Sequence, residues 1–443
     1  MYKRQESQDD NKKGAFNRRD WLVGTAGLVG GGLLKTAYDA IIPRQQSQTS
    51  LSEETFEEEE YEEDTSIDVP EDATKVLGDL PGELGKRSPF ETPRRKIMVP
   101  YHSGYSTTPL QDLNGILTPS DLHFERHHGG IPEIDPNKYQ LLIHGMVERP
   151  LLLSLADLKR FPATSQINFL ECSGNGYLSL PSKATTEKVS AQEMDGLIST
   201  SEWTGVSLAL LLKEVGVKAG AKWLLAEGGD AAVLTRSVPL EKAYKDAMIA
   251  YGQNGEAIRP EQGYPARLFL PGYEGSANVK WLRRIEISDQ PFMTREETSK
   301  YTDVLNDGKA RLFTLEMGAK SIITFPSYPY VLPEKGWWEV RGYAWSGAGK
   351  IAKVEISTNG GKNWQLAELQ QPVLSKCQTR FRFLWYWNGQ RTTLMSRATD
   401  EKGQVQLSPT AFFKTHGPGT FYHNNQIRTW RIEPNGEVFF DMS

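Results

Sequence analysis

The C-terminal part of the chain carries strand signals at short intervals, and these constrain the fold more than any other feature. From Trp338 onward, short β-branched and aromatic runs alternate with turn markers such as Asn359-Gly360-Gly361 and Asn388-Gly389. One run places four aromatic side chains on a single strand face: Phe381, Phe383, Trp385 and Trp387. We expect these strands to form an immunoglobulin-like β-sandwich, with Phe412–Lys414 as a further strand.

The preceding region mixes strand and helix signals. Ser154-Leu155-Ala156-Asp157 has the capping pattern that begins a short helix. Two longer helices are predicted at Trp203–Val215, ended by Gly216, and at Pro239–Tyr251. Asp289–Pro333 is proline-rich and predicts a loop that connects this region to the sandwich. A chain of 443 residues is longer than a single hydrophobic core usually accommodates. The chain is therefore predicted to be an α+β protein with two domains.

The N-terminal residues predict export. Asn17-Arg18-Arg19-Asp20-Trp21-Leu22 is a twin-arginine pattern. The weakly apolar run Leu22–Leu34 follows it and is too short and too rich in glycine for a stable membrane span. We expect residues 1–40 to be a twin-arginine signal that delivers the folded protein to the periplasm.

An acidic stretch follows the predicted signal. Residues 51–80 contain thirteen acidic side chains and one Lys, a local net charge of −12 within a whole-chain charge of −5. Such a run cannot bury enough apolar surface to fold, because its charges repel one another and stay hydrated. Residues 41–104 are therefore predicted to be a disordered acidic linker.

Cys172 is the first candidate for chemistry. The chain has only Cys172 and Cys377, so it has no disulfide framework. The apolar run Ile167–Glu171 predicts a buried strand, and Ser173-Gly174-Asn175-Gly176 predicts a tight turn whose N–H groups face the sulfur. Such surroundings lower the pKa of a thiol and favour a nucleophile or a metal ligand, although a buried structural cysteine stays open as an alternative. We expect Cys377 to be structural.

Four stretches, in this order, resemble the sulfite oxidase family of molybdopterin enzymes over about residues 105–430. They are Phe124–Pro132, Glu171–Asn175, Gly263–Trp281 and Arg341–Gly347. The resemblance implies a molybdopterin-binding catalytic domain at residues 105–310 and an immunoglobulin-like dimerisation domain at residues 311–443. The implied cofactors are molybdenum and molybdopterin.

The resemblance also implies roles for single residues. Cys172 matches the thiolate ligand of molybdenum, a soft ligand suited to this metal. Arg126 and Tyr301 match catalytic positions, with Tyr301 hydrogen-bonding at the open face of the metal and handling protons. The residues implied to bind the cofactor are His128, Asp230, Arg267, Asn278, Val279 and Lys280.

Other roles stay open for some of these residues. Arg267 is also a candidate partner for a carboxylate such as Glu261, and Tyr301 for a loop residue that only packs against the domain. His127, next to His128, is expected to be a solvated turn residue.

Departures from the family pattern bear on the substrate. Tyr177 stands where sulfite-oxidising members have an arginine, Gly263 where they have a histidine, and the region near His416 lacks another pocket arginine. Fewer cations weaken a pocket for a small dianion. Leu122–Pro150 and Phe169–Gly176 resemble the sulfane dehydrogenase branch of the Sox thiosulfate-oxidation system. That branch oxidises a cysteine persulfide on a sulfur-carrier protein and passes electrons to a c-type cytochrome subunit.

The implied partners are therefore a carrier protein and a cytochrome, in a homodimer or a heterotetramer with the cytochrome. The sequence has no Cys-x-x-Cys-His haem attachment motif, so the electron acceptor is expected to be a separate protein. It also has no nucleic-acid-binding motif. The alternatives are a sulfite dehydrogenase acting on free sulfite, a cofactor-free secreted binding module, and a reductase of oxidised methionine or a similar sulfoxide.

Overall fold

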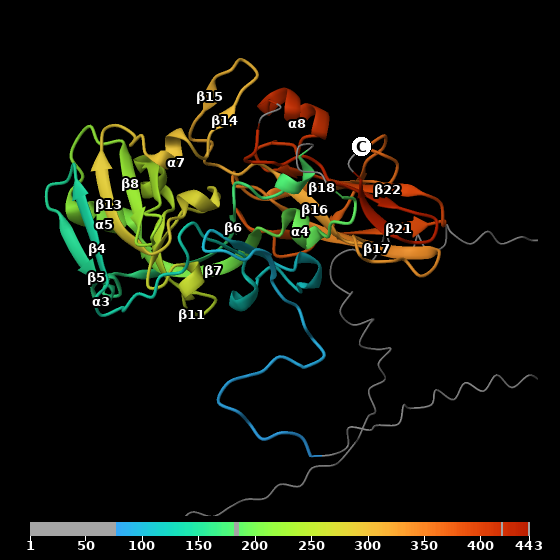
Figure 1. Cartoon of the computed structure of the whole chain (residues 1–443), viewed down its shortest axis with the longest axis horizontal. Coiled ribbons are helices and arrows are strands. Elements are labelled where there is room, and N and C mark those ends of the chain that lie inside the picture. The colour runs from blue at the N-terminus through green and yellow to red at the C-terminus, as the bar shows by residue number, and fades with distance from the viewer. Residues whose placement is uncertain (1–76, 181–185, 418–419, 442–443) are drawn as a thin grey trace, which may run out of the picture. The chain divides into compact units, whose positions relative to one another are not determined.

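The computed structural model describes residues 77–180, 186–417 and 420–441 (Figure 1). The predicted signal and most of the predicted acidic linker lie outside these residues. Gly85–Ser443 forms one compact unit. Its first strand, β1 (Lys96–Val99), lies inside the segment predicted to be a linker. This part of the segment is ordered, because Lys96 and Ile97 pair with strand β2 (Tyr105–Thr107). No helix in the described part of the chain is both long and apolar enough to cross a bilayer.

The N-terminal half is built on two five-stranded sheets. The first has the order β5-β4-β13-β8-β9, and β13 is parallel to β4 but antiparallel to β8. The bounds of its strands are β4 (Gln140–Gly145), β5 (Leu151–Ser154), β8 (Trp223–Gly228), β9 (Thr235–Pro239) and β13 (Leu282–Ser288). The second has the order β11-β10-β7-β6, with β12 also paired to β10. Its strands are β6 (Ala163–Glu171), β7 (Ile198–Ser207), β10 (Met248–Gln253), β11 (Glu256–Ala257) and β12 (Arg267–Phe269).

Short helices connect these strands. They are α3 (Leu155–Leu158), α4 (Ala191–Asp195), α5 (Leu208–Val215), α6 (Leu240–Lys245) and α7 (Arg295–Thr298). The capping box predicted at Ser154 is present, since its side chain accepts from the Asp157 N–H. The two longer predicted helices are only partly right. Trp203–Ser207 belongs to β7 and Met248–Tyr251 to β10, because tertiary strand pairing overrides local helix propensity there.

The C-terminal half is the predicted β-sandwich. One sheet has the order β16-β17-β21-β20, with β16 (Lys320–Phe325), β17 (Gly336–Trp345), β20 (Glu368–Leu369) and β21 (Thr379–Trp387). The other has the order β19-β18-β22-β23-β24, with β18 (Ile351–Ser357), β19 (Gln365–Leu366), β22 (Thr392–Asp400), β23 (Thr429–Ile432) and β24 (Val438–Asp441). The aromatic face of β21 points into the core as predicted, while Leu384 and Tyr386 face outward.

Two local predictions in this half are wrong. The predicted strand Phe412–Lys414 lies in helix α8 (Pro409–His416), which begins with a proline and is capped by Ser408. Strand β16 lies inside the predicted connecting loop, as do α7 and the hairpin β14 (Asp303–Val304) with β15 (Ala310–Arg311). The prolines that suggested a loop stand beside these elements rather than within them.

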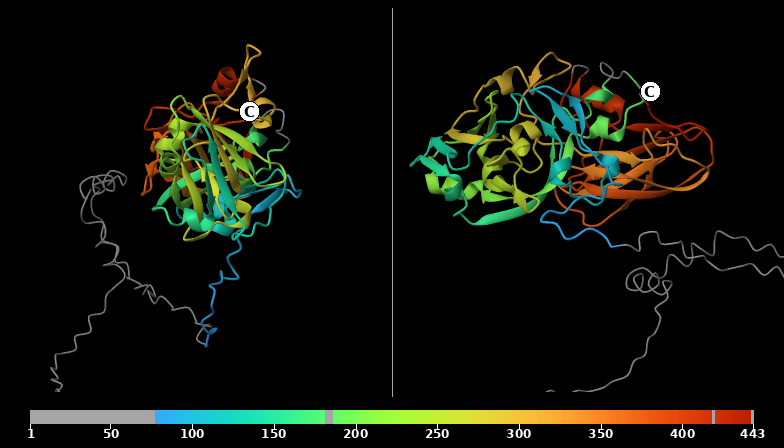
Figure 2. Two further views of the ribbon diagram at one scale, coloured as in Figure 1. Left: turned by 90° about the vertical axis from the view of Figure 1, so that its left-hand side faces the viewer. Right: turned by 60° about the horizontal axis from the view of Figure 1, so that its bottom comes forward.

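One continuous cluster of buried apolar side chains joins the two halves. It contains Val340, Trp345 and Phe381 of the sandwich together with Phe169 of β6 and Ile198 of β7. Figure 1 shows β6 and β7 running up to the sandwich strands, and the right-hand view of Figure 2 agrees with this. The end of β6 is therefore packed against the second half. The overall architecture is α+β, as predicted, with an immunoglobulin-like sandwich after the mixed-sheet region.

Candidate active site

A cavity at the end of β6 brings together most of the predicted site residues. Those that line it are Arg126, His128, Cys172, Asp230, Arg267, Asn278, Lys280 and Tyr301. Arg126 comes from β3 (Glu125–Arg126), which pairs with β2, and the others come from strand ends and the loops between strands. The structure does not bring Val279 to this cavity, since its side chain is buried in the core of the N-terminal half.

Cys172 follows directly on β6 and begins a tight turn, as predicted. Its N–H donates to the Leu197 carbonyl at 3.0 Å, and the Asn175 N–H donates back to the Cys172 carbonyl at 2.9 Å. In the protein alone, burial raises the pKa of the Cys172 thiol, while the Gly174 N–H and Arg126 oppose that rise without overcoming it. The lowered pKa expected from the turn is thus wrong, because desolvation outweighs the turn donor. Cys377 is buried, in line with a structural role.

Arg267 is buried, and its partners among the described residues are all neutral. Its guanidinium donates to the carbonyls of Gln262 at 2.9 Å and Asn278 at 2.8 Å, and it lies 5.1 Å from the centre of the Trp203 ring. Its Nε has no partner among the described residues. Burial lowers the pKa of Arg267 to about 9. The alternative pairing with Glu261 is not formed, because the nearest ion-pair partner of that carboxylate is Arg95.

Lys280 is a second cavity cation that has no carboxylate partner in the described part of the chain. Its ammonium group donates to the carbonyls of Arg126 and Glu261, both at 3.0 Å, and lies 2.9 Å from the Nδ1 of His127. Burial, followed by the nearby Arg267, lowers the pKa of Lys280 well below its ordinary value. His127 is therefore not a solvated turn residue. It is buried, and its Nε2 lies 2.8 Å from a carboxylate oxygen of Glu125.

These two cations test whether the cavity suits the implied cofactor. A buried charge that has only neutral partners is costly, and an anion that enters the cavity removes that cost. The Nε–H of Arg267 is also unused, and it can donate a hydrogen bond to a phosphate oxygen. Cys172 supplies a soft sulfur ligand in the same cavity. The residues thus fit a molybdenum cofactor with an anionic phosphate.

Tyr301 and His128 form a pair at the edge of this cavity. The Tyr301 hydroxyl lies 2.9 Å from the Nε2 of His128. Burial raises the pKa of Tyr301. Burial, then Arg126 and Lys280, lowers the pKa of His128 to about 4. Near neutral pH both side chains are uncharged, so they form a hydrogen-bonded donor and acceptor pair beside the cations.

The sequence interpretation missed a buried charged group behind Tyr301. The Glu274 carboxylate accepts from Arg236 at 2.8 Å and from the Nε2 of His423 at 3.2 Å. Burial opposes ionisation of Glu274, but Arg236 and His423 hold its pKa at about 2. The Arg236 guanidinium lies 4.8 Å from the centre of the Tyr301 ring. No local pattern signals this group, because its members stand far apart in the sequence.

Comparison with known proteins identifies the chemistry of the cavity. Residues 128–296 match the model of the oxidoreductase molybdopterin binding domain, and residues 311–429 match that of the Mo-co oxidoreductase dimerisation domain. The crystal structure of the sulfane dehydrogenase SoxCD from Paracoccus pantotrophus has a TM-score of 0.80 and 42% sequence identity. That match covers 83% of this chain and 95% of the solved chain.

Curated relatives include NADH nitrate reductases. The NADH nitrate reductase of Ulva prolifera is 31% identical over 59% of this chain and 34% of its own length. NADH nitrate reductase 1 of Phaseolus vulgaris is 30% identical over 65% of this chain and 36% of its own length. The chain thus spans about a third of the length of these relatives. The two domain matches and the likeness along nearly the whole solved chain place this protein in the sulfite oxidase family of molybdopterin oxidoreductases, with molybdenum and molybdopterin as its cofactor.

Proposed function

We propose that this protein oxidises the sulfane sulfur of a cysteine persulfide on a carrier protein and passes the electrons to a c-type cytochrome subunit. The observation that carries the proposal is the aromatic surrounding of Tyr177, at the position where sulfite-oxidising members have an arginine. Its hydroxyl lies 2.7 Å from the Tyr105 hydroxyl, and its ring lies 6.0 Å from that of Phe421. The 42% identity to a sulfane dehydrogenase supports the same reading.

Tyr105, Tyr177, Phe421 and Tyr422 form what we call the aromatic rim. Tyr105 pairs with Arg126 across β2 and β3, and the Tyr422 ring lies 5.2 Å from that of Tyr301. Burial and the hydrogen bond to Tyr177 raise the pKa of Tyr105, so this part of the rim stays neutral. A neutral, polarisable rim favours sulfur carried on a peptide arm over a small free dianion.

Gly263 removes a second cation position from the pocket. Its φ of +110° strains any residue with a side chain, and a Cβ there would lie 3.0 Å from the Cβ of Lys280. The backbone therefore disfavours a histidine at this point. Arg311 lies 3.0 Å from His416, which places one cation in that region, but Arg311 does not line the cavity.

The cavity residues have separate tasks in this proposal. Arg267 and Lys280 bind the anionic part of the cofactor, and Cys172 provides the sulfur ligand. The chemistry that the bound cofactor supplies is a two-electron oxidation of sulfur with an oxygen atom from water, which releases two protons per cycle. The hydrogen-bonded pair of Tyr301 and His128 accepts one of those protons.

The proposal also covers location and assembly. The twin-arginine pattern at Arg18-Arg19 supports export of the folded protein to the periplasm. The match to a dimerisation domain supports a homodimer or a heterotetramer with the cytochrome.

The test compares two substrates with one acceptor. Protein purified after native export is analysed for molybdenum, and is then assayed with free sulfite and with a persulfide-loaded carrier protein, using cytochrome c as acceptor. We expect about one molybdenum per chain and faster turnover of the carrier. Strong sulfite turnover with an inactive carrier would instead identify a sulfite dehydrogenase. Molybdenum-free protein would support a binding module, and a sulfoxide reductase would be inactive in both oxidation assays.

A further inference from the structure

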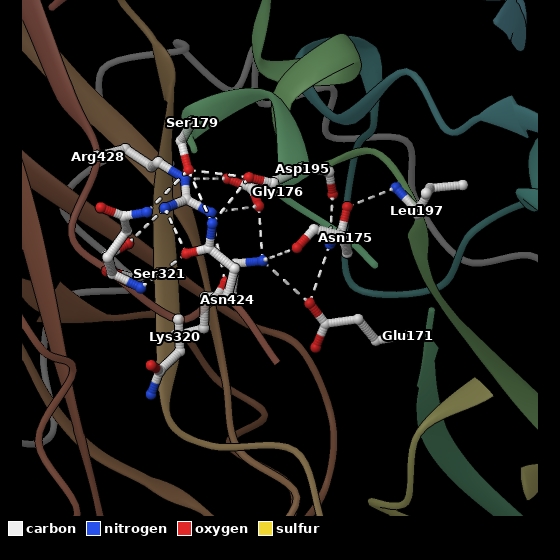
Figure 3. A network of polar contacts seen from close by, with 12 residues as sticks. Glu171, Asn175, Gly176, Ser179, Asp195, Leu197, Lys320, Ser321, Asn424 and Arg428 are labelled. Carbon is white, nitrogen blue, oxygen red and sulfur yellow. Dashed lines mark hydrogen bonds and ion pairs between the residues drawn. The ribbon is translucent and has the colours of Figure 1, made fainter. Parts of the chain in front are cut away.

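Two cations of the C-terminal half lie directly behind the turn that carries Cys172. Lys320 begins β16, and Arg428 precedes β23; each is only 2% exposed. Figure 3 shows both side chains converging on the segment between Glu171 and Ser179. Neither residue lines the cavity, so neither is placed to touch a cofactor or a substrate.

Asp195, at the end of α4, joins the two cations. Its carboxylate lies 2.6 Å from the Lys320 ammonium and accepts from the Nε of Arg428 at 2.9 Å and from the Nη2 at 3.1 Å. Burial opposes ionisation of Asp195, but Arg428 and Lys320 hold its pKa below the ordinary value. Glu171 is the second acid, with its Oε1 at 3.1 Å from Lys320. Two buried cations thus face two buried carboxylates, and the group is neutral as a whole.

Asn175 connects this group to the turn itself. Its side-chain amide donates to Glu171 at 2.9 Å and to the Asp195 carbonyl at 3.0 Å, and its side-chain oxygen accepts from the Leu197 N–H at 3.0 Å. Its backbone N–H closes the turn on the Cys172 carbonyl. The side-chain amide of Asn175 therefore ties the turn to Glu171 and Asp195, and its backbone carbonyl accepts from Lys320 at 3.4 Å.

Gly176 shows how closely the backbone packs on the group. It has a φ of +84°, and a Cβ there would lie 2.8 Å from an Asp195 carboxylate oxygen and would collide with Arg428. The Gly176 carbonyl also accepts from the side chain of Asn424 at 3.0 Å. The Gly176 backbone thus packs against Arg428 and Asn424 of the C-terminal half too closely to leave space for a side chain.

We propose that Lys320 and Arg428 are positioning residues for Cys172, so that the C-terminal half helps to fix the direction of the metal-binding sulfur. A buried, fully paired charged group is stiff, because moving any member leaves a charge without its partner. Since the group is neutral, it acts on the geometry of the turn rather than on the charge of the cavity. This inference rests on the proposed role of Cys172 as metal ligand.

Lys320→Met is the main test, with two measurements. The first is the Mo(V) electron paramagnetic resonance signal of the reduced enzyme, together with kcat and KM. The second is the rate at which iodoacetamide alkylates Cys172 in the full chain produced without pterin synthesis; the buried Cys377 serves as an internal reference. We expect shifted g-values, a lower kcat with a nearly unchanged KM, and alkylation roughly tenfold faster, which corresponds to about 1.4 kcal/mol of easier local opening.

Three further variants keep the test decisive. Adding Glu171→Gln to Lys320→Met restores charge balance and is expected to return the spectrum and the alkylation rate toward wild type. Lys242→Met removes a buried lysine that pairs with Asp246 away from the turn, and is expected to change stability only. Arg428→Lys keeps the charge but loses the two-pronged contact with Asp195, and it carries the test if Lys320→Met does not fold.

The outcomes separate this inference from the proposed function. If Lys320→Met changes the spectrum and the alkylation rate no more than Lys242→Met does, the positioning role is overturned while the metal-ligand role stands. If the Cys172→Ser variant contains molybdenum and gives the same Mo(V) signal as wild type, the proposed metal-ligand role itself fails.

Discussion

Lys280 offers the sharpest test of the cofactor site, because its removal is expected to affect the cofactor-bound protein and the cofactor-free chain differently. Among the described residues, its ammonium group contacts two carbonyls, one imidazole nitrogen and the face of the Trp281 ring but no carboxylate, and its pKa is held well below the ordinary value by burial and Arg267. In the chain alone, the charged form of Lys280 is therefore costly. An anionic cofactor removes that cost. Lys280→Met is then expected to harm cofactor binding much more than folding.

The expected size follows from the contacts. A hydrogen bond to a charged group contributes about 1.5–3 kcal/mol, so loss of the Lys280 contact weakens cofactor retention roughly 10- to 150-fold. In the cofactor-free chain, the gain from removing a buried charge offsets the loss at the Arg126 and Glu261 carbonyls. The free energy of unfolding is therefore expected to change by less than about 2 kcal/mol.

The assay needs a control that separates cofactor loss from instability. Molybdenum per chain is measured by mass spectrometry after extended dialysis, and unfolding of the cofactor-free chain is followed in urea. Lys242→Met is the matched control, since Lys242 is also buried but lies 2.6 Å from the Asp246 carboxylate and outside the cavity. It is expected to destabilise the fold by roughly 1–3 kcal/mol and to retain molybdenum. Full retention by Lys280→Met, or equal loss by both variants, would refute the reasoning.

Three other substitutions test single parts of the site. Cys172→Ser is expected to abolish turnover while leaving a folded protein, checked by activity and thermal unfolding; retained activity would exclude the ligand role. Tyr301→Phe removes the contact with His128 and is expected to lower kcat by roughly 10²-fold with a smaller effect on KM, measured by steady-state kinetics. An unchanged kcat would leave Tyr301 as a packing residue. Tyr177→Arg is expected to raise kcat/KM for free sulfite roughly tenfold and to lower turnover of the carrier; no gain with sulfite would contradict the role given to the aromatic rim. The last prediction concerns pH. Because the pKa of Glu274 is depressed to about 2, its contribution to stability is complete above its ordinary pKa and is lost as the pH falls toward 2. Glu274→Gln is expected to flatten acid unfolding in that range, and an unchanged acid transition would argue against the buried pair.

Local sequence patterns were sufficient for the features that depend on neighbours in the chain. The strand that ends just before Cys172, the turn after it, the capping box at Ser154 and the inward aromatic face of β21 all follow from residues a few positions apart. Patterns failed where distant strands decided the outcome. Trp203 lies in β7 rather than in a helix, because β6 and β10 pair with that strand on both sides.

The residues implied by the family resemblance meet at one cavity, with the exception of Val279, and the sequence thus determined the chemistry at hand: one thiol, three cations and a tyrosine. Only the tertiary structure decided their state. Burial lowers the pKa of Arg267 and Lys280, so that an anion in the cavity stabilises their charged forms. Burial also raises the pKa of the Cys172 thiol, which the turn alone was expected to lower. It also places Lys320 and Arg428 behind Cys172 from more than a hundred residues away. The physical reason is desolvation together with long-range ion pairing, since neither is encoded in any short stretch of the chain.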